Sequence, residues 1–592
     1  MKTISNIIRL FAIIFLISCS NTGNKNVITR ELMAHIKYLS SDSLKGRLTG
    51  SPGDSFAADY IRSKLTSYGL VPLKDDGLQR YKVTDKIIEG KNNSLTINKV
   101  DYIVDKDFMP FSFSEIASLE AEVVFAGYGF NINTDSLKWK DYEKLNVKGK
   151  WVLILRGDPE PENSMSKFAS FGGDRDKALI AKDMGAAGVI FVSGEGIDKE
   201  DNFEPLVKGE FSVGIPVFRV KRALADMVLS KSGKKISELE KKLNKTKRPA
   251  GFSTGVVVSG KAEVIQERVT TRNVVMLLPG EDNKLKDEYI IMGAHFDHLG
   301  MGGRGSSSRV PDTIGIHHGA DDNASGVAMM LELAEKFAAA KGSHKRSMVF
   351  ISFSGEEEGL FGSKYFTDNP EVDLSKVDLM INMDMVGRLK ETKDLQIGGV
   401  GTANGLKEKA ASKCDTNLLK LAFTEAGSGP SDHSSFYAKD IPVLFITTGA
   451  HSDYHTPSDT WNKINFDGMV VVSDLVFKLA SDIACDSTRL HFKEAGPKTE
   501  VTRSYRRRGV TFGIMPDFAG VVKNGLRADL VTPGGPAANG GMKKGDIITS
   551  VDGKKVNNIQ DYMFRLNQLK KGQTVSVEIL RNNKKEVLII QL

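Results

Sequence analysis

A histidine and a carboxylate lie two residues apart at the end of a short apolar run. His295 and Asp297 follow residues 289–292, a run typical of a buried strand. Residues two apart on a strand project from the same face. An imidazole backed by a carboxylate is a common way for proteins to prepare a metal ligand. The pattern therefore predicts one corner of a metal centre.

Four further clusters of carboxylates or histidines follow downstream, at residues 319–326, 354–360, 382–385 and 453–460. Three of the five clusters lie at the carboxyl ends of predicted parallel strands, where α/β sheets bind ligands. Two histidines and three carboxylates, besides Asp297, make a mixed nitrogen and oxygen set that suits zinc, and less specifically cobalt or manganese. A catalytic zinc usually has three protein ligands, so five ligands predict two ions that share a bridging carboxylate.

The elements that must position these residues alternate between strands and helices from residue 272 to about 485. Strands are expected at 273–278, 289–292, 347–353, 377–383 and 442–446, and helices at 325–337 and 468–479. This alternation predicts an α/β fold in which helices sandwich a mostly parallel sheet.

A chain of 592 residues is too long for one core. The expected divisions are a signal peptide (1–18), a tether (19–26), the N-terminal part of the α/β domain (27–118), a β-rich insert (119–260), the main part of the α/β domain with the five clusters (261–490), a linker (491–507) and a C-terminal domain (508–592).

The insert and the C-terminal domain each resemble a known module. The short β-runs around 122–129, 151–155 and 188–192 resemble the protease-associated (PA) domain. Residues 531–538 and 545–553 resemble a PDZ domain, with residues 511–514 where such domains place their carboxylate-binding loop. PDZ domains bind peptides by adding a strand to a sheet edge, so a peptide C-terminus or strand is the expected partner.

The N-terminus predicts export and lipidation. Lys2 and Arg9 precede an apolar run at 10–17 that is too short to span a bilayer and fits a signal peptide. The run ends in a sequence that resembles a bacterial lipobox, which implies cleavage before Cys19 and a lipid anchor on its thiol. Ser20, in place of an aspartate, favours the outer membrane of the cell envelope. The small net charge of +7 gives no support to nucleic-acid binding.

Taken together, the five clusters resemble those of the co-catalytic zinc peptidases, a family that includes bacterial leucine aminopeptidases, plasma glutamate carboxypeptidase and prostate-specific membrane antigen. The resemblance extends from about Ile28 to Cys485. It implies that His295 and Asp384 bind one zinc ion, that Glu357 and His455 bind the other, and that Asp322 bridges them.

The resemblance also implies the catalytic groups. Glu356 becomes the general base for a water that the two ions activate, and Asp297 holds the ring of His295. Tyr454 matches a tyrosine that stabilises the oxyanion in some members. Relatives often carry a cis peptide after the bridging aspartate, so one is expected at Asp322-Asn323.

Some alternatives stay open within these motifs. Asp321 could replace Asp322, and Glu358 is an extra carboxylate. The additional imidazoles near the site are interpreted as supporting or loop residues, and Asp432 as a residue that orders the pocket; these imidazoles are His298, His317, His318 and His451. The long loop at 299–316 is expected to cover the pocket. Cys414 and Cys485 are expected to be separate thiols.

The predicted function is a zinc-dependent exopeptidase acting on peptides, and we favour an aminopeptidase because most bacterial relatives act at the amino end. A carboxypeptidase or dipeptidase is the first alternative, since Arg304, Arg309 or Arg388 could grip a substrate carboxylate. Glutaminyl cyclases share the fold but use one zinc. A peptide-binding lipoprotein without catalysis is the alternative from another class.

Overall fold

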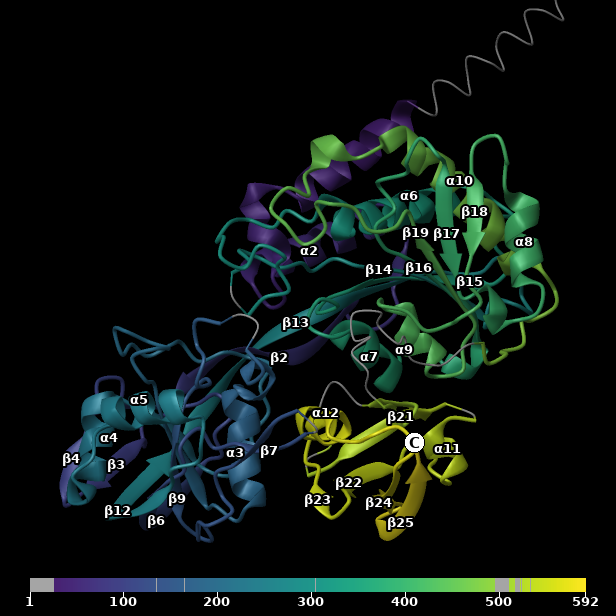
Figure 1. Ribbon diagram of the computed structural model, residues 1–592. Helices are drawn as coiled ribbons and strands as arrows, with labels where there is room; N and C mark the ends of the chain where they lie inside the picture. The colour runs from purple at the N-terminus through teal and green to yellow at the C-terminus, as the bar shows by residue number, and fades with distance from the viewer. Residues whose placement is uncertain are drawn as a thin grey trace, which may run out of the picture.

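The computed structural model describes residues 26–134, 136–163, 166–303, 305–495, 510–516, 522, 524–532 and 534–592. The expected signal peptide, the lipidation site Cys19, most of the linker at 491–507 and Arg304 lie outside these residues. In this part of the chain no helix combines the length and the apolar character needed to cross a membrane. The described residues form three packed units, which Figure 1 shows in purple and green, blue, and yellow.

The first unit is built on a sheet whose centre is parallel. Its strand order is β1-β13-β15-β14-β16-β19-β17-β18, and β2 also pairs with β13. Neighbours among β15, β14, β16 and β19 run parallel, whereas β13 and β17 join this centre in antiparallel fashion. The strands are β1 (Val71–Pro72), β2 (Leu78–Glu89), β13 (Val264–Leu278), β14 (Tyr289–His295), β15 (Ser347–Phe353), β16 (Val377–Met383), β17 (Asp394–Gly398), β18 (Lys420–Phe423) and β19 (Val443–Thr447).

Helices cover both faces of this sheet. Ile290 and Met292 of β14 belong to a core that includes residues of the helix at 26–39 and of α2, α6, α8 and α10, whereas Ile291 belongs to a second core with residues of α7 and α9. Every residue of β15 and β16 is buried, as expected for parallel strands covered on both sides. The other helices are α2 (Pro52–Ser67), α6 (Gly326–Ala339), α7 (Phe361–Asp368), α8 (Leu406–Lys413), α9 (His433–Tyr437) and α10 (Phe466–Cys485).

A two-stranded ribbon joins the first unit to the second. β2 and β13 pair antiparallel from Leu78 and Val274 outward to Glu89 and Val264 (Figure 1). The register shifts once along this ladder, where Thr84 pairs with Arg268 and Lys86 with Glu267. Asp85 is therefore an extra residue, which makes a β-bulge in the ribbon.

The second unit is an α/β insert with its own sheet, of order β4-β3-β12-β6-β9-β10-β11-β5. Its strands β3, β4 and β5 precede residue 119, so this sheet begins earlier in the sequence than the expected boundary. The elements are β3 (Ser94–Ile97), β4 (Val100–Tyr102), β5 (Phe108–Pro110), β6 (Ala117–Phe125), β9 (Trp151–Leu155), α3 (Asp174–Asp183), β10 (Gly188–Val192), β11 (Val217–Val220), α4 (Arg222–Leu229), α5 (Ile236–Thr246) and β12 (Phe252–Ala262), besides the hairpin β7 (Asn131–Asn133) and β8 (Lys138–Lys140).

The third unit is a small sheet of order β20-β21-β22-β24-β25, with β23 beside β22. Phe512 and Tyr562 meet edge to face in its core, with ring centroids 5.7 Å apart. Its elements are β20 (Ile514–Pro516), β21 (Leu526–Val531), α11 (Pro536–Asn539), β22 (Ile547–Val551), β23 (Lys554–Lys555), α12 (Ile559–Asn567), β24 (Thr574–Arg581) and β25 (Lys584–Gln591).

Helix α12 docks the third unit onto the insert. Arg175 of α3 donates to the buried carboxylate of Asp561 at 2.7 Å. Arg565 donates to Asp183 of the insert at 2.9 Å, and Phe564 packs against the insert core. The C-terminal unit therefore rests on the insert through buried charges as well as apolar contact.

Candidate metal centre

The parallel strands bring the chemical groups to one edge of the first sheet. His295 ends β14, Glu356 and Glu357 follow β15, and Asp384 follows β16 directly. Carboxyl ends of neighbouring parallel strands share an edge, so these side chains converge there. His455 reaches the same edge from the loop after β19.

Asp322 comes from the turn at Ala320–Ser325 that leads into α6. The Asp322-Asn323 peptide is cis, as expected from the sequence. Gly326 begins α6 so close to β16 that a Cβ there would lie 2.3 Å from the carbonyl oxygen of Met383. The absence of a side chain at Gly326 thus lets the helix start against the strand end, beside the metal centre.

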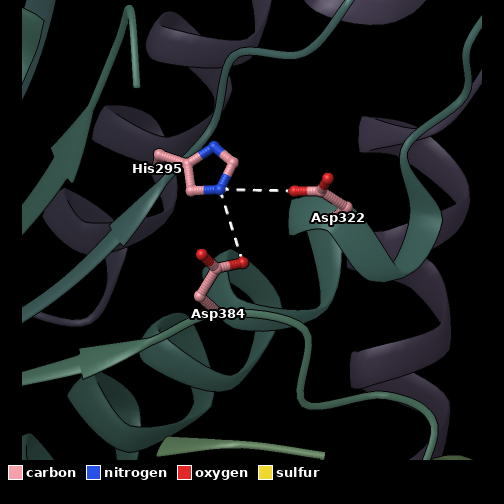
Figure 2. A group of neighbouring side chains, drawn as sticks. All are labelled: His295, Asp322 and Asp384. Carbon is pink, nitrogen blue, oxygen red and sulfur yellow. Dashed lines mark ion pairs between the residues drawn. The ribbon is translucent and has the colours of Figure 1, made fainter. Parts of the chain in front are cut away.

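The first cluster consists of His295, Asp322 and Asp384 (Figure 2). Nε2 of His295 lies 3.4 Å from Oδ1 of Asp322 and 3.4 Å from Oδ1 of Asp384. All three residues are buried, and Oδ1 of Asp384 has no hydrogen-bond donor among the described residues. Buried carboxylates that lack donors need a cation, so this cluster suits a metal ion.

The second cluster lies on the other side of Asp322. Nε2 of His455 is 3.2 Å from Oδ2 of Asp322 and 3.1 Å from Oε2 of Glu357. Oδ1 of Asp322 faces His295 and Oδ2 faces His455. The two oxygens of one carboxylate therefore point into two different clusters.

Asp297 supports the loop that carries both glutamates. Its carboxylate accepts hydrogen bonds from the hydroxyl of Thr49 at 2.9 Å, the backbone N–H of Glu356 at 3.1 Å and that of Glu357 at 3.4 Å. Nδ1 of His295 lies 3.3 Å from the carbonyl oxygen of Asp297 and 3.7 Å from its carboxylate. The carbonyl oxygen of Asp297 therefore lies nearer to the histidine than its carboxylate does, and the carboxylate anchors the glutamates.

The loop at 299–316 holds the second histidine. Nδ1 of His455 lies 2.9 Å from the carbonyl oxygen of Ser307, so it donates its proton there. That hydrogen bond leaves the lone pair of Nε2 directed at the carboxylates. Leu299 and Met301 of the same loop line a cavity of about 3450 Å³, which Glu357 and His298 also line.

The charged side chains at this centre shift one another's pKa values. Burial raises the pKa of Glu356 well above its usual range, and the charge of Glu357 adds to that effect. Burial opposes ionisation of His295, yet the carboxylates of Glu356 and Asp384 raise its pKa well above 6.5. Burial also opposes ionisation of Asp322, while His295 and His455 hold its pKa well below 3.8. The excess of carboxylates makes the centre attractive to cations.

Tyr454 lies beside the clusters. Its ring stacks on that of His455, with centroids 3.8 Å apart. Burial raises the pKa of Tyr454 well above 10, and the charges of Asp322 and Glu357 add to this rise. Its hydroxyl therefore stays protonated and can act as a donor.

The alternative carboxylates face other partners. Asp321 accepts the N–H of Gly387 at 2.6 Å, and its other oxygen lies 3.2 Å from Nε2 of His451. Glu358 pairs with Lys208 of the insert at 2.5 Å. Asp432 is fully buried, and burial raises its pKa to about 7. These contacts direct Asp321 and Glu358 away from the two clusters.

The additional imidazoles differ from one another. His317 contacts the hydroxyl of Ser308 at 2.8 Å and a backbone carbonyl within its own loop. His318 contacts Asp42 at 2.9 Å. These two are loop residues, as expected, whereas Nδ1 of His298 lies 2.7 Å from Oε1 of Glu357.

Two supporting residues were missed by sequence reasoning. Arg47 has no exposed surface and donates to the carbonyl oxygens of Phe296, His318, Gly319 and Leu39. Burial lowers its pKa to about 10, although Asp297 and Asp322 oppose that shift. Asp459 accepts the backbone N–H groups of Asp321 at 2.8 Å and Asp322 at 3.0 Å. No spacing in the sequence connects Arg47 with the distant segments that it holds.

Comparison with known proteins identifies three modules. Residues 273–480 match Peptidase family M28, residues 119–228 match the PA domain and residues 506–592 match the PDZ domain. Aminopeptidase YwaD of Bacillus subtilis is 25% identical over 448 residues, which is 74% of this chain and 81% of that protein. Leucine aminopeptidase 1 of Ajellomyces dermatitidis is 29% identical over 230 residues, which is 36% of this chain and 56% of that protein.

Among solved structures, an aminopeptidase from Aneurinibacillus sp. strain AM-1 aligns with a TM-score of 0.44 and 24% identity, covering 79% of this chain and 95% of its own. A zinc aminopeptidase from Bacillus subtilis aligns with a TM-score of 0.44 and 22% identity, covering 77% of this chain and 94% of its own.

The fold and the converging carboxylates and histidines define a hydrolase with a candidate metal centre, and the predicted α/β fold class is confirmed. More particularly, the chain has the fold of Peptidase family M28, with a PA insert and a C-terminal PDZ domain, and it is a hydrolase.

Proposed function

We propose that this protein is a zinc-dependent aminopeptidase that hydrolyses peptide bonds with two zinc ions and with Glu356 as general base. The observation that carries the two-ion proposal is the bridging position of Asp322, whose two oxygens face His295 and His455 separately. The M28 match and the aminopeptidase names of the relatives support the reaction class.

The residues present fit such a centre. One ion would be held by His295, Asp384 and Asp322, and the other by Glu357, His455 and Asp322. The unpartnered oxygen of Asp384 and the mixed nitrogen and oxygen donors suit zinc, with cobalt or manganese as possible substitutes. When bound, the two ions supply Lewis acidity and bring the pKa of a water close to neutrality.

In this proposal Glu356 moves the proton. Its carboxylate lies 4.0 Å from Nε2 of His295, and its backbone is fixed by the carboxylate of Asp297. Burial gives its carboxylate a high proton affinity, which suits a group that takes a proton from water and returns it to the leaving amine. The protonated hydroxyl of Tyr454 would donate to the developing oxyanion.

The charges around the centre favour the amino end of a peptide. The excess of carboxylates suits a protonated amine. Arg388 is one of the residues that could bind a substrate carboxylate. It instead pairs with Asp453 at 3.1 Å and with Asp459 at 3.3 Å. Arg309 is exposed, on the loop that holds His455.

The experiment is Glu356→Gln in the zinc-loaded chain. Release of amino acids from short peptides should fall about 10²–10⁴-fold, the usual contribution of a general base, while the zinc content stays the same. Glu358→Gln is the matched control, because that carboxylate pairs with Lys208, and it should change activity only a few-fold.

Full activity of the Glu356→Gln variant would refute its role as base. A saturated chain that holds no more than about one zinc would refute the two-ion centre. Cleavage of N-blocked peptides, without cleavage of peptides with free amino ends, would refute the aminopeptidase assignment.

We further propose that the chain is anchored in the cell envelope through a lipid on Cys19, in the outer membrane. The support is the lipobox-like sequence that ends at this cysteine. Cys19→Ala should move the protein from the membrane fraction to the soluble fraction, and an unchanged distribution would contradict the anchor.

We also propose that the PDZ domain binds a peptide C-terminus or strand, because residues 511–514 lead into its strand β20. Fluorescence anisotropy with matched peptides tests this proposal. Weaker binding of amidated peptides than of free carboxylates would support recognition of the terminus, and no binding of either would contradict it.

A further inference from the structure

His298 faces the second cluster, whereas the sequence placed it among the supporting residues. Its Nδ1 lies 2.7 Å from Oε1 of Glu357 and 3.9 Å from Oδ2 of Asp322. Its ring meets that of His455 at 72°, with centroids 5.8 Å apart. His298, Asp322 and Glu357 offer ligand atoms that lie within 4.8 Å of one another, the same closeness as in the cluster of His295.

We propose that His298, through Nδ1, is a fourth protein ligand of the ion held by Glu357, His455 and Asp322. This inference rests on the two-ion centre proposed above. The two ion sites then differ in their number of protein ligands, because three residues surround the first ion and four surround the second.

The ring of His298 is held for this task. Its backbone N–H donates to the carbonyl oxygen of Arg47 at 3.1 Å, and only 1% of the residue is exposed. A Cβ at Gly319 would lie 2.6 Å and 2.7 Å from two carbons of the imidazole. Gly319 therefore lets the turn that carries Asp322 approach the ring, and the packing keeps Nδ1 toward the carboxylates.

The unequal ligand sets predict unequal affinities. A site closed by four protein ligands is typical of tightly held zinc, whereas three protein ligands leave a position for water or substrate. The ion beside His298 should therefore bind first and leave last. The ion beside His295 and Asp384 should exchange more readily.

A different reading is that neutral His298 only donates a hydrogen bond to Glu357 and orients it. His298→Asn separates the two readings. The amide nitrogen of asparagine can reach about the position of Nδ1 and can donate to Glu357, but an amide is a poor zinc ligand. His317→Asn is the matched control, because that imidazole bonds to Ser308 and a carbonyl oxygen and meets the site only through its ring, whose centroid lies 6.4 Å from that of His298.

The measurement is competitive zinc titration of the full chain against a chromogenic chelator. Wild type and His317→Asn should each bind two ions in two separate steps. His298→Asn should weaken the tighter step more than about 100-fold, beyond the 10–100-fold typical of losing a supporting hydrogen bond. The absorption spectrum of the cobalt-loaded protein should change as well. A smaller loss with an unchanged spectrum would overturn the proposal.

A second measurement needs no variant. In crystals of the zinc-loaded wild type, Nδ1 of His298 should lie about 2.0–2.1 Å from an anomalous zinc peak. A separation of more than about 3 Å would overturn the proposal, because it exceeds any zinc–nitrogen bond. If the chain binds two ions and Glu356→Gln loses activity, such a result removes only this inference. If the chain binds no second ion, the proposed function itself fails.

Discussion

Arg47 offers a direct test of how the N-terminal segment supports the metal centre. Its guanidinium is completely buried and donates to Phe296 at 2.7 Å, His318 at 2.8 Å and Gly319 at 3.0 Å, as well as to Leu39. The oxygen of Phe296 lies next to His295 in the sequence, those of His318 and Gly319 lie shortly before Asp322, and that of Leu39 lies in the helix at 26–39. Arg47→Met would keep much of the volume of the side chain but remove every donor.

The expected loss of stability follows from these bonds. A buried carbonyl oxygen left without a donor costs about 1–3 kcal/mol, and Arg47 serves four of them. Relaxation and entry of water would reduce the sum. Removing one partner from a buried charged network typically costs about 3–5 kcal/mol, so we expect the variant to lose at least about 3 kcal/mol.

Urea unfolding, combined with hydrogen exchange of β14 and α6, would locate this loss in the peptidase unit. Arg62→Met is the control, because Arg62 is 36% exposed and pairs with Asp59 at 3.6 Å. A surface pair of this kind is worth at most about 1 kcal/mol. An Arg47→Met variant no less stable than Arg62→Met would refute the reasoning.

Two further predictions concern the other units. Burial raises the pKa of Asp141 from 3.8 to about 7, so the folded insert keeps a proton that the unfolded chain releases, and its stability should fall as the pH rises from about 4 to about 7. Asp141→Asn should reduce this dependence of the free energy of unfolding on pH, measured by urea unfolding followed by tryptophan fluorescence. An unchanged pH dependence would contradict the raised pKa of Asp141. Arg175→Ala and Asp561→Ala should be non-additive by about 0.5–3 kcal/mol in a double-mutant cycle, because the pair is buried at 2.7 Å. Additive effects on unfolding would show that the pair does not join the two units.

The sequence was informative where chemistry follows directly from a strand. His295, Glu356 and Asp384 each come at or just after the end of an apolar run, and parallel pairing then brings them together. The alternative between Asp321 and Asp322 could not be decided from sequence, because both are buried in the same turn. Only the fold shows that Asp321 turns toward Gly387.

The supporting contacts were beyond prediction for a physical reason. Arg47 and Phe296 are 249 positions apart in the sequence, with the whole insert between them. The strands β3, β4 and β5 are only three or four residues long, so periodicity could not assign them to the insert sheet. Spacing alone does not reveal which way the ring of His298 turns, so the sequence could not assign it to the second cluster.

The bulge at Asp85 has a mechanical consequence. The β2 and β13 ribbon forms an arm between the first two units, and its ladder is regular except at this bulge. The extra residue makes the bulge the place where this arm can flex. Helix α12 holds the third unit on the insert through the Arg175–Asp561 contact, and all three units line the 3450 Å³ cavity, so a bend at the bulge would change the width of this cavity. The size of peptide admitted to the centre would then depend on a position that lines the same cavity but belongs to neither cluster.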